Sequence, residues 1–174
     1  MKNTKKNEKA VAYHEAGHAV VGWKLFGLRR VKKMTIIPKK NSLGQVKNRM
    51  IMRSIDYEVA DSPAFDGKVM REIMGCYAGH VAEKKLTKKA NNMGASQDFR
   101  NAVDLAFHLY GASDEKLLKH LQNYLYRRTE LLIDREWNLV KAVARELLRK
   151  KILDSDDFYK ITEEEFKKEI KRPA

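Results

Sequence analysis

The residues best suited to chemistry in this sequence lie near its N-terminus, where His14, Glu15 and His18 form the pattern H-E-x-x-H. Residues at positions i and i+4 share one face of a helix, so both imidazoles can bind the same Zn²⁺ ion. Glu15 follows the first histidine and can reach a water molecule in the remaining coordination position. Zinc lowers the pKa of that water and polarises a carbonyl group, while a nearby carboxylate accepts the proton. The motif therefore predicts a peptidase with one zinc ion, held by His14 and His18, and with Glu15 as the catalytic base.

A pair of core histidines, hydrogen-bonded to backbone carbonyls, is the alternative interpretation of the same pattern. The surrounding helix is predicted from about Glu8 to Phe26, and its other residues are mostly apolar or small, so it is expected to be buried. Burying two imidazoles and a carboxylate on such a helix without a metal would cost considerable free energy. The composition of the helix therefore favours the metal site.

The motif supplies two protein ligands, and the residues alone leave the third one open. Asp98 lies in the first turn of a helix predicted to start near Ser96, where the helix dipole favours a carboxylate in any case. Glu83, on a helix predicted over Asp66–Leu86, is either a rival ligand or a group that orients a liganding histidine. A metzincin is excluded because the glycine and histidine that would have to follow His18 are absent. We expect the other candidates to be structural or surface residues: His80, His108, His120 and Asp104.

Small residues recur at helical spacing along the helix predicted over Asp66–Leu86. A stripe of this kind lets the backbone of another helix approach closely, so this helix is a candidate to pack against the H-E-x-x-H helix. Three further helices are predicted toward the C-terminus, over Ser113–Asp134, Glu136–Lys151 and Ser155–Ile170. The small residues are Gly75, Ala78, Gly79 and Ala82.

A strand predicted over Val31–Ile37 ends at Pro38 and is followed by a turn at about Asn41–Gly44 and a second, alternating strand that contains Met50 and Met52. An edge strand offers free backbone groups to an extended peptide, so Thr35, Ile36 and Ile37 are candidate substrate-binding residues. Ordinary sheet structure explains the same pattern equally well. The predicted fold is α+β and mostly helical, with a small hairpin near the N-terminal third.

Composition limits the remaining possibilities. The 174 residues suit a single domain over 1–174, with a basic, disordered tail over residues 1–8. Cys76 is the only cysteine and no apolar run is long enough to cross a bilayer, so we expect a soluble, cytoplasmic protein. The formal net charge of +13 could attract nucleic acid, but no nucleic-acid motif supports that function. A lysine-rich solvated surface is the preferred explanation.

Several sequence blocks resemble the peptidase domain of the FtsH family of proteases, peptidase family M41, and they occur in that family's order. The resemblance covers roughly residues 8–163. It implies a mostly helical zincin domain, Asp98 as the third zinc ligand and an edge strand that holds extended substrate. His80 stands where the family usually has arginine. The blocks are Ala12–Val21, Thr35–Pro38, Ala78–Glu83, Gly94–Asp98 and Leu109–Ser113.

The sequence also departs from that family, because it contains neither a membrane anchor nor a G-x-x-x-x-G-K-[ST] phosphate loop. We therefore expect an ATP-independent endopeptidase that cleaves peptides or unfolded segments, alone or with a separate ATPase or adaptor. One alternative is a catalytically silent scaffold or binding protein of the same fold, which would not need Glu15. Another is a regulatory zinc protease that depends on a partner and uses Glu83 as the third ligand. The oligomeric state stays open.

Overall fold

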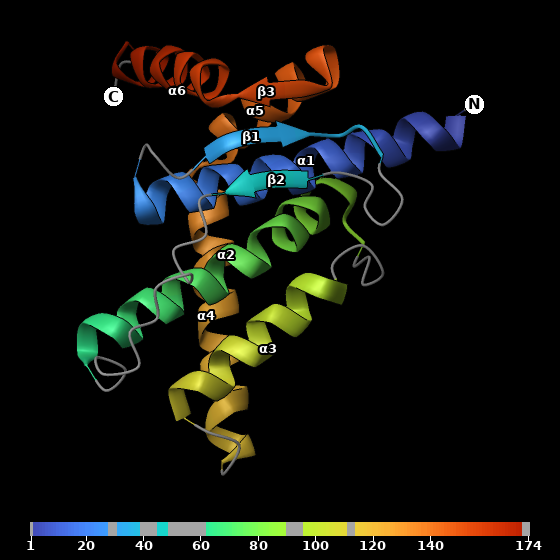
Figure 1. Cartoon of the computed structure of the whole chain (residues 1–174). Coiled ribbons are helices and arrows are strands. Elements are labelled where there is room, and N and C mark those ends of the chain that lie inside the picture. Colours follow the sequence, from blue (N-terminus) through green and yellow to red (C-terminus); the bar gives the residue numbers. More distant parts are fainter. Residues whose placement is uncertain are drawn as a thin grey trace.

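The computed structural model describes residues 2–27, 31–38, 45–48, 62–89, 96–110 and 114–171. These ranges contain six helices and a three-stranded sheet (Figure 1). The predicted α+β, mostly helical class is confirmed. The elements, in chain order, are α1 (Lys2–Phe26), β1 (Val31–Thr35), β2 (Gln45–Asn48), α2 (Pro63–Thr87), α3 (Ser96–Tyr110), α4 (Glu115–Arg135), α5 (Trp137–Lys150), β3 (Ile152–Asp154) and α6 (Ser155–Ile170).

Helix α1 carries the H-E-x-x-H motif and begins at Lys2, ahead of the predicted start near Glu8. The basic segment that we expected to be a disordered tail instead continues the helix. Its lysines and glutamate are good helix formers, and it contains neither proline nor glycine. The helix ends at Gly27 as predicted, where a φ of +85° suits a residue without a side chain. The backbone N–H of Gly27 donates to the carbonyl of Trp23 at 2.8 Å.

Helix α2 starts earlier than its apolar periodicity indicates, because the signals for its beginning are polar. The hydroxyl of Ser62 accepts a hydrogen bond from the backbone N–H of Phe65 at 3.2 Å, and Pro63 occupies the first turn. At the other end Lys88 adopts the left-handed conformation, with a φ of 58°. These caps explain why α2 extends over Pro63–Thr87 rather than Asp66–Leu86.

Ala78, Gly79 and Ala82 of α2 lie against α1, and the two helices pack at very short range. A Cβ atom placed on Gly17 of α1 would lie 2.5 Å from the backbone oxygen of Ala78 and 2.7 Å from the Cβ of Ala82. Only glycine fits this position without displacing the neighbouring backbone. The close approach predicted from the small-residue stripe is confirmed. In Figure 1, α3 lies beside α2.

The sheet has the order β2-β1-β3, with both pairs antiparallel, so β1 is its middle strand. Within β1, Met34 pairs with Val46 of β2 on one side and with Leu153 of β3 on the other. Of the two interpretations of Val31–Ile37, the structure supports ordinary sheet structure and contradicts the edge strand. Strand β3 was missed because three residues between two helices are too few to show an alternating pattern. The predicted turn at 41–44 and the Met50–Met52 pair lie outside the described residues.

The C-terminal segment also occupies the end of β1. The carbonyl of Lys151 accepts hydrogen bonds from the backbone N–H of Ile36 and from the hydroxyl of Thr35, each at 3.1 Å. The backbone N–H of Ile37 donates to the same hydroxyl at 3.1 Å. Thr35, Ile36 and Ile37 thus make internal contacts, and strand addition to β1 is not available as their role.

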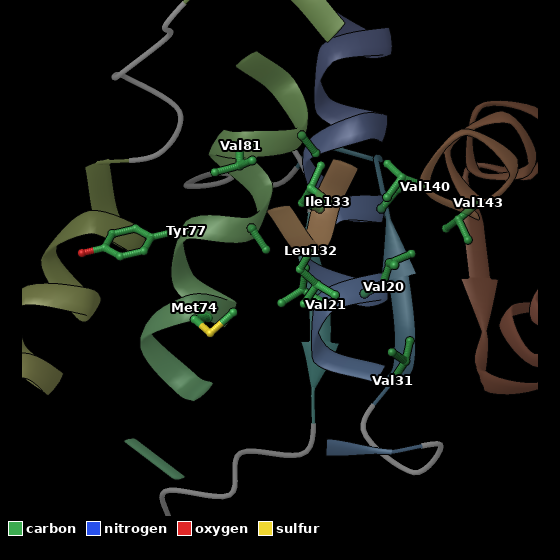
Figure 2. Packing of buried hydrophobic residues seen from close by; sticks show 14 of the residues in the cluster. Val20, Val21, Val31, Met74, Tyr77, Val81, Leu132, Ile133, Val140 and Val143 are labelled. Carbon is green, nitrogen blue, oxygen red and sulfur yellow. The ribbon is translucent and has the colours of Figure 1, made fainter. Parts of the chain in front are cut away.

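One hydrophobic core joins the helices and the sheet (Figure 2). Val20 and Val21 of α1 are fully buried, together with Ile133 of α4, Val140 of α5 and Val31 of β1. Helix α1 therefore has neighbours on several sides, and its imidazoles project from a backbone that packing holds in place. Within the described ranges, no helix is long and apolar enough to cross a bilayer.

Candidate metal centre

The two histidines of the motif lie one turn apart on α1 and present the same ring nitrogen to each other. Their Nε2 atoms are 3.1 Å apart, and the rings meet edge to face with centroids separated by 4.8 Å. Both side chains are partly buried. Helical spacing thus brings two nitrogen ligands together, as the sequence predicts.

Asp98 reaches the same point from the first turn of α3. Its Oδ2 atom lies 3.3 Å from Nε2 of His14 and 3.3 Å from Nε2 of His18. A tetrahedral zinc ion with bonds of about 2.0–2.1 Å needs ligand atoms about 3.3–3.4 Å apart. The distances between these two nitrogens and one oxygen are therefore close to those that zinc requires. Among the described residues, these three form the group that could hold a metal ion.

Helix α2 contacts the opposite nitrogen of each imidazole. Nδ1 of His18 lies 2.8 Å from the carbonyl oxygen of Gly75, so Nδ1 carries the proton and donates it. Nδ1 of His14 lies 3.4 Å from Oε2 of Glu83, which is buried. These contacts leave Nε2 of each ring directed toward Asp98, as liganding histidines require. The arrangement favours Asp98 as the third ligand and Glu83 as the group that orients His14.

The electrostatics of the cluster depend on burial and on its carboxylates. Burial opposes protonation of His14, but Asp98, Glu83 and Glu15 together outweigh it and raise the pKa of His14 to about 9. Burial would likewise raise the pKa of Asp98, but the two imidazoles hold it well below its usual range. Asp98 therefore stays ionised, while His14 retains a proton that a metal ion must displace.

Glu15 is buried beside the first histidine, and its negative charge is among the causes of the raised pKa of His14. A carboxylate on the residue that follows a ligand is well placed to accept a proton close to the metal position. The structure thus keeps the proposed base close enough to His14 for its charge to act on that imidazole.

Gly79 of α2 lies directly against both imidazoles, a role that the sequence did not reveal. A Cβ atom at this position would lie 2.4 Å from Nε2 of His18 and 2.6 Å from Nε2 of His14. The absent side chain leaves room for the two nitrogens that face the metal position. The signal was present in the small-residue stripe, which we interpreted only as a helix contact.

The other sequence candidates lie outside this cluster. His80 is buried and packs edge to face against Phe99, with centroids 5.0 Å apart, which agrees with a structural role. His108, His120 and Asp104 are exposed on α3 and α4. None of them belongs to the group of described residues that could hold a metal.

Replacing Gly79 by alanine should weaken zinc binding by about 10–100-fold, because the new methyl group displaces both imidazoles. Gly75→Ala is the matched control, since a Cβ there meets nothing within 4 Å and its carbonyl is retained. Zinc affinity would be measured by competition with a chelating dye, and the fold of the metal-free variants by circular dichroism. Equal affinities for the two variants would show that Gly79 does not shape the site.

Separate substitutions should distinguish the two carboxylates. Asp98→Asn removes a charged ligand and should reduce zinc affinity by about 100-fold or more. This loss exceeds the one expected for a residue that only contacts a ligand. Glu83→Gln keeps an oxygen that can accept from Nδ1 of His14, so its loss should be about tenfold. Bound zinc would be quantified for each protein after dialysis against limiting chelator. A larger loss for Glu83→Gln would make Glu83 the ligand.

Zinc binding should release a proton from His14 over a defined pH range. Because the pKa of His14 is raised from 6.5 to about 9, its interaction with the carboxylates stabilises the metal-free protein fully below 6.5. That contribution is lost as the pH rises through about 9, and zinc affinity should increase over the same range. Calorimetric titrations in buffers of different ionisation enthalpy would count the protons. Proton release that does not decline above a pH of about 9 would contradict this assignment.

Comparison with known proteins agrees with this geometry. The model of Peptidase family M41 matches residues 1–115. The ATP-dependent zinc metalloprotease FtsH of Magnetococcus marinus is 32% identical over 158 residues, which cover 89% of this chain and 22% of that protein. FtsH 3 of Phytoplasma mali is 30% identical over 161 residues, covering 82% of this chain and 26% of the relative. The chain thus spans about a quarter of the length of these two relatives. It belongs to peptidase family M41.

Proposed function

We propose that this chain is a zinc endopeptidase that hydrolyses peptide bonds in peptides or unfolded protein segments without using ATP. The observation that carries the proposal is the convergence of His14, His18 and Asp98 at distances suited to zinc, with Glu15 buried beside them. A merely structural pair of histidines would not need a carboxylate of low pKa between the two Nε2 atoms.

Each functional residue of the chain would have a separate role in the reaction. His14 and His18 would hold the metal through Nε2, and Asp98 through Oδ2. Zinc, when bound, supplies the Lewis acid that acidifies water and polarises the scissile carbonyl. Glu15 accepts a proton from the attacking water and delivers it to the departing amine. Glu83 and the carbonyl of Gly75 keep the imidazoles in the orientation that the ligands need.

The sheet restricts how an extended substrate could bind. Because β1 is paired on both sides, a peptide that adds to this sheet must do so along β2 or β3. Both edge strands are short, and each contains one charged residue, Lys47 in β2 and Asp154 in β3. An extended substrate would therefore lie along one of these two edges.

We propose that the source of unfolded substrate lies outside these 174 residues. The relatives named above are ATP-dependent, whereas these 174 residues contain no phosphate-binding loop. We propose that the domain cleaves chains that are already unfolded or that a separate ATPase or adaptor delivers. The single cysteine supports a reducing compartment, and we propose the cytoplasm as the location.

Cleavage of unfolded casein without ATP tests the proposal. Wild-type protein with bound zinc should cleave casein, and a chelator should abolish the activity. Glu15→Gln should retain zinc but lose about 100-fold or more in turnover, because only the proton acceptor is removed. His120→Ala, which changes an exposed histidine on α4, should retain both zinc and activity.

The combined result identifies which part of the proposal fails. Undiminished cleavage by Glu15→Gln would exclude Glu15 as the base. Absence of zinc from reconstituted wild-type protein would overturn the metal site itself. Zinc binding without cleavage of casein would overturn autonomous activity and favour the partner-dependent protease.

A further inference from the structure

Helix α4 exposes a row of large apolar side chains on the face that it does not bury. Leu117, Tyr124 and Leu131 are 43%, 54% and 54% exposed. They are seven residues apart, so they lie two turns from one another along one line of the helix. The row is about 21 Å long at a rise of 1.5 Å per residue. We name these three residues the α4 row.

The opposite side of α4 already has its partners inside the molecule. Tyr126 packs against Tyr77 of α2 with ring centroids 5.4 Å apart, and the hydroxyl of buried Thr129 lies 3.5 Å from the carbonyl oxygen of Met74 of α2. Leu118 is buried as well. The α4 row is therefore not needed to hold the helix in the fold, since another face of α4 does so.

The surface around the α4 row is positively charged. Arg128 lies over the ring of Tyr124, with its guanidinium 5.7 Å from the ring centroid. The side chains of Arg127 and Arg135 are 65% and 74% exposed although each contacts a glutamate. Along α4, five exposed basic residues outnumber two exposed acidic ones: Lys116, Lys119, Arg127, Arg128 and Arg135 against Glu115 and Asp134.

We propose that the α4 row and its arginines form a docking site for an acidic amphipathic helix of a partner protein. Apolar residues at a spacing of seven match the seam of a second helix packed alongside. Carboxylates beside that seam would pair with Arg127, Arg128 and Arg135. The partner is thus defined by leucine-type side chains on one face and by glutamate or aspartate on the flanks.

Two other occupants fit the surface less well. A second copy of this chain that docked through the same face would place the same arginines against one another, which opposes association. An anionic bilayer would favour a broad apolar face, whereas this row is a single line of three side chains with Arg127 and Arg128 beside it. Neither a second copy nor a bilayer would use both the seven-residue spacing of the apolar side chains and the positive charge of the arginines beside them.

A synthetic peptide provides a direct test. The probe is a fluorescein-labelled peptide of about 18 residues, with leucines along one helical face and glutamates elsewhere. A second peptide of the same composition has its leucines distributed around the helix. Fluorescence anisotropy with the full chain should show about tenfold tighter binding of the patterned peptide. Equal binding of both peptides would overturn the proposal, because charge alone would then explain the affinity.

Substitutions on α4 and α6 test where the patterned peptide binds. Leu117→Asp combined with Leu131→Asp should abolish the preference for the patterned peptide, with zinc content and circular dichroism unchanged. Phe166→Asp combined with Ile170→Asp is the matched control, because these α6 side chains are 64% and 69% exposed but lie on another helix. The control should retain the preference. Retention by the α4 variant would show that the docking site lies elsewhere.

Two further measurements exclude the competing occupants. Vesicles that contain phosphatidylglycerol should bind wild type and the α4 variant alike, and the two proteins should have the same molar mass in solution. Vesicle binding that depends on Leu117 and Leu131 would replace the partner helix with a membrane. A dimer that the same substitutions dissociate would replace it with a second copy.

Discussion

The candidate metal centre depends on the short distance between α1 and α2. At Gly17 the two backbones are so close that a single methyl group would collide with the carbonyl of Ala78. Because of this proximity, the carbonyl of Gly75 and the carboxylate of Glu83 reach the imidazoles of α1. A larger separation would leave both Nδ1 atoms without these partners, and the rings could rotate away from Asp98. Glycine on both helices is therefore a condition of the site as well as of the packing.

The short distance between α1 and α2 also couples the charge of His14 to the charges of the carboxylates around it. Three carboxylates act on His14, and burial alone would disfavour each ionised group. The cluster is stable because the negative charge of Asp98 lies between two imidazoles and that of Glu83 contacts His14 from behind. In the proposed enzyme, zinc would take over the positive charge that protonated His14 now supplies. The site is thus arranged to exchange a proton for a cation without leaving a buried carboxylate uncompensated.

How well the sequence predicted each part of the structure depended on how far apart in the chain the interacting residues lie. Local signals sufficed to predict the helices and the histidine pair, because period and capping are properties of neighbouring residues, but α1 and α2 begin earlier than predicted. Asp98 became a specific prediction only through the family resemblance, since spacing cannot show that the start of α3 lies over the middle of α1. The steric role of Gly79 was likewise hidden, because a contact between helices does not appear in the pattern of either one.

Whether β1 is an edge strand or an inner strand could not be decided from the sequence for the same reason. Its second partner, β3, lies more than a hundred residues later and is three residues long. That pairing also shows that the family match over residues 1–115 does not contain the whole environment of α1. Trp137 packs against Tyr13, Phe158 packs against Trp23, and the side chain of Lys151 forms an ion pair with Glu8. The C-terminal third therefore covers the side of α1 that α2 does not, so the helix that carries both histidines is packed between these two parts of the molecule.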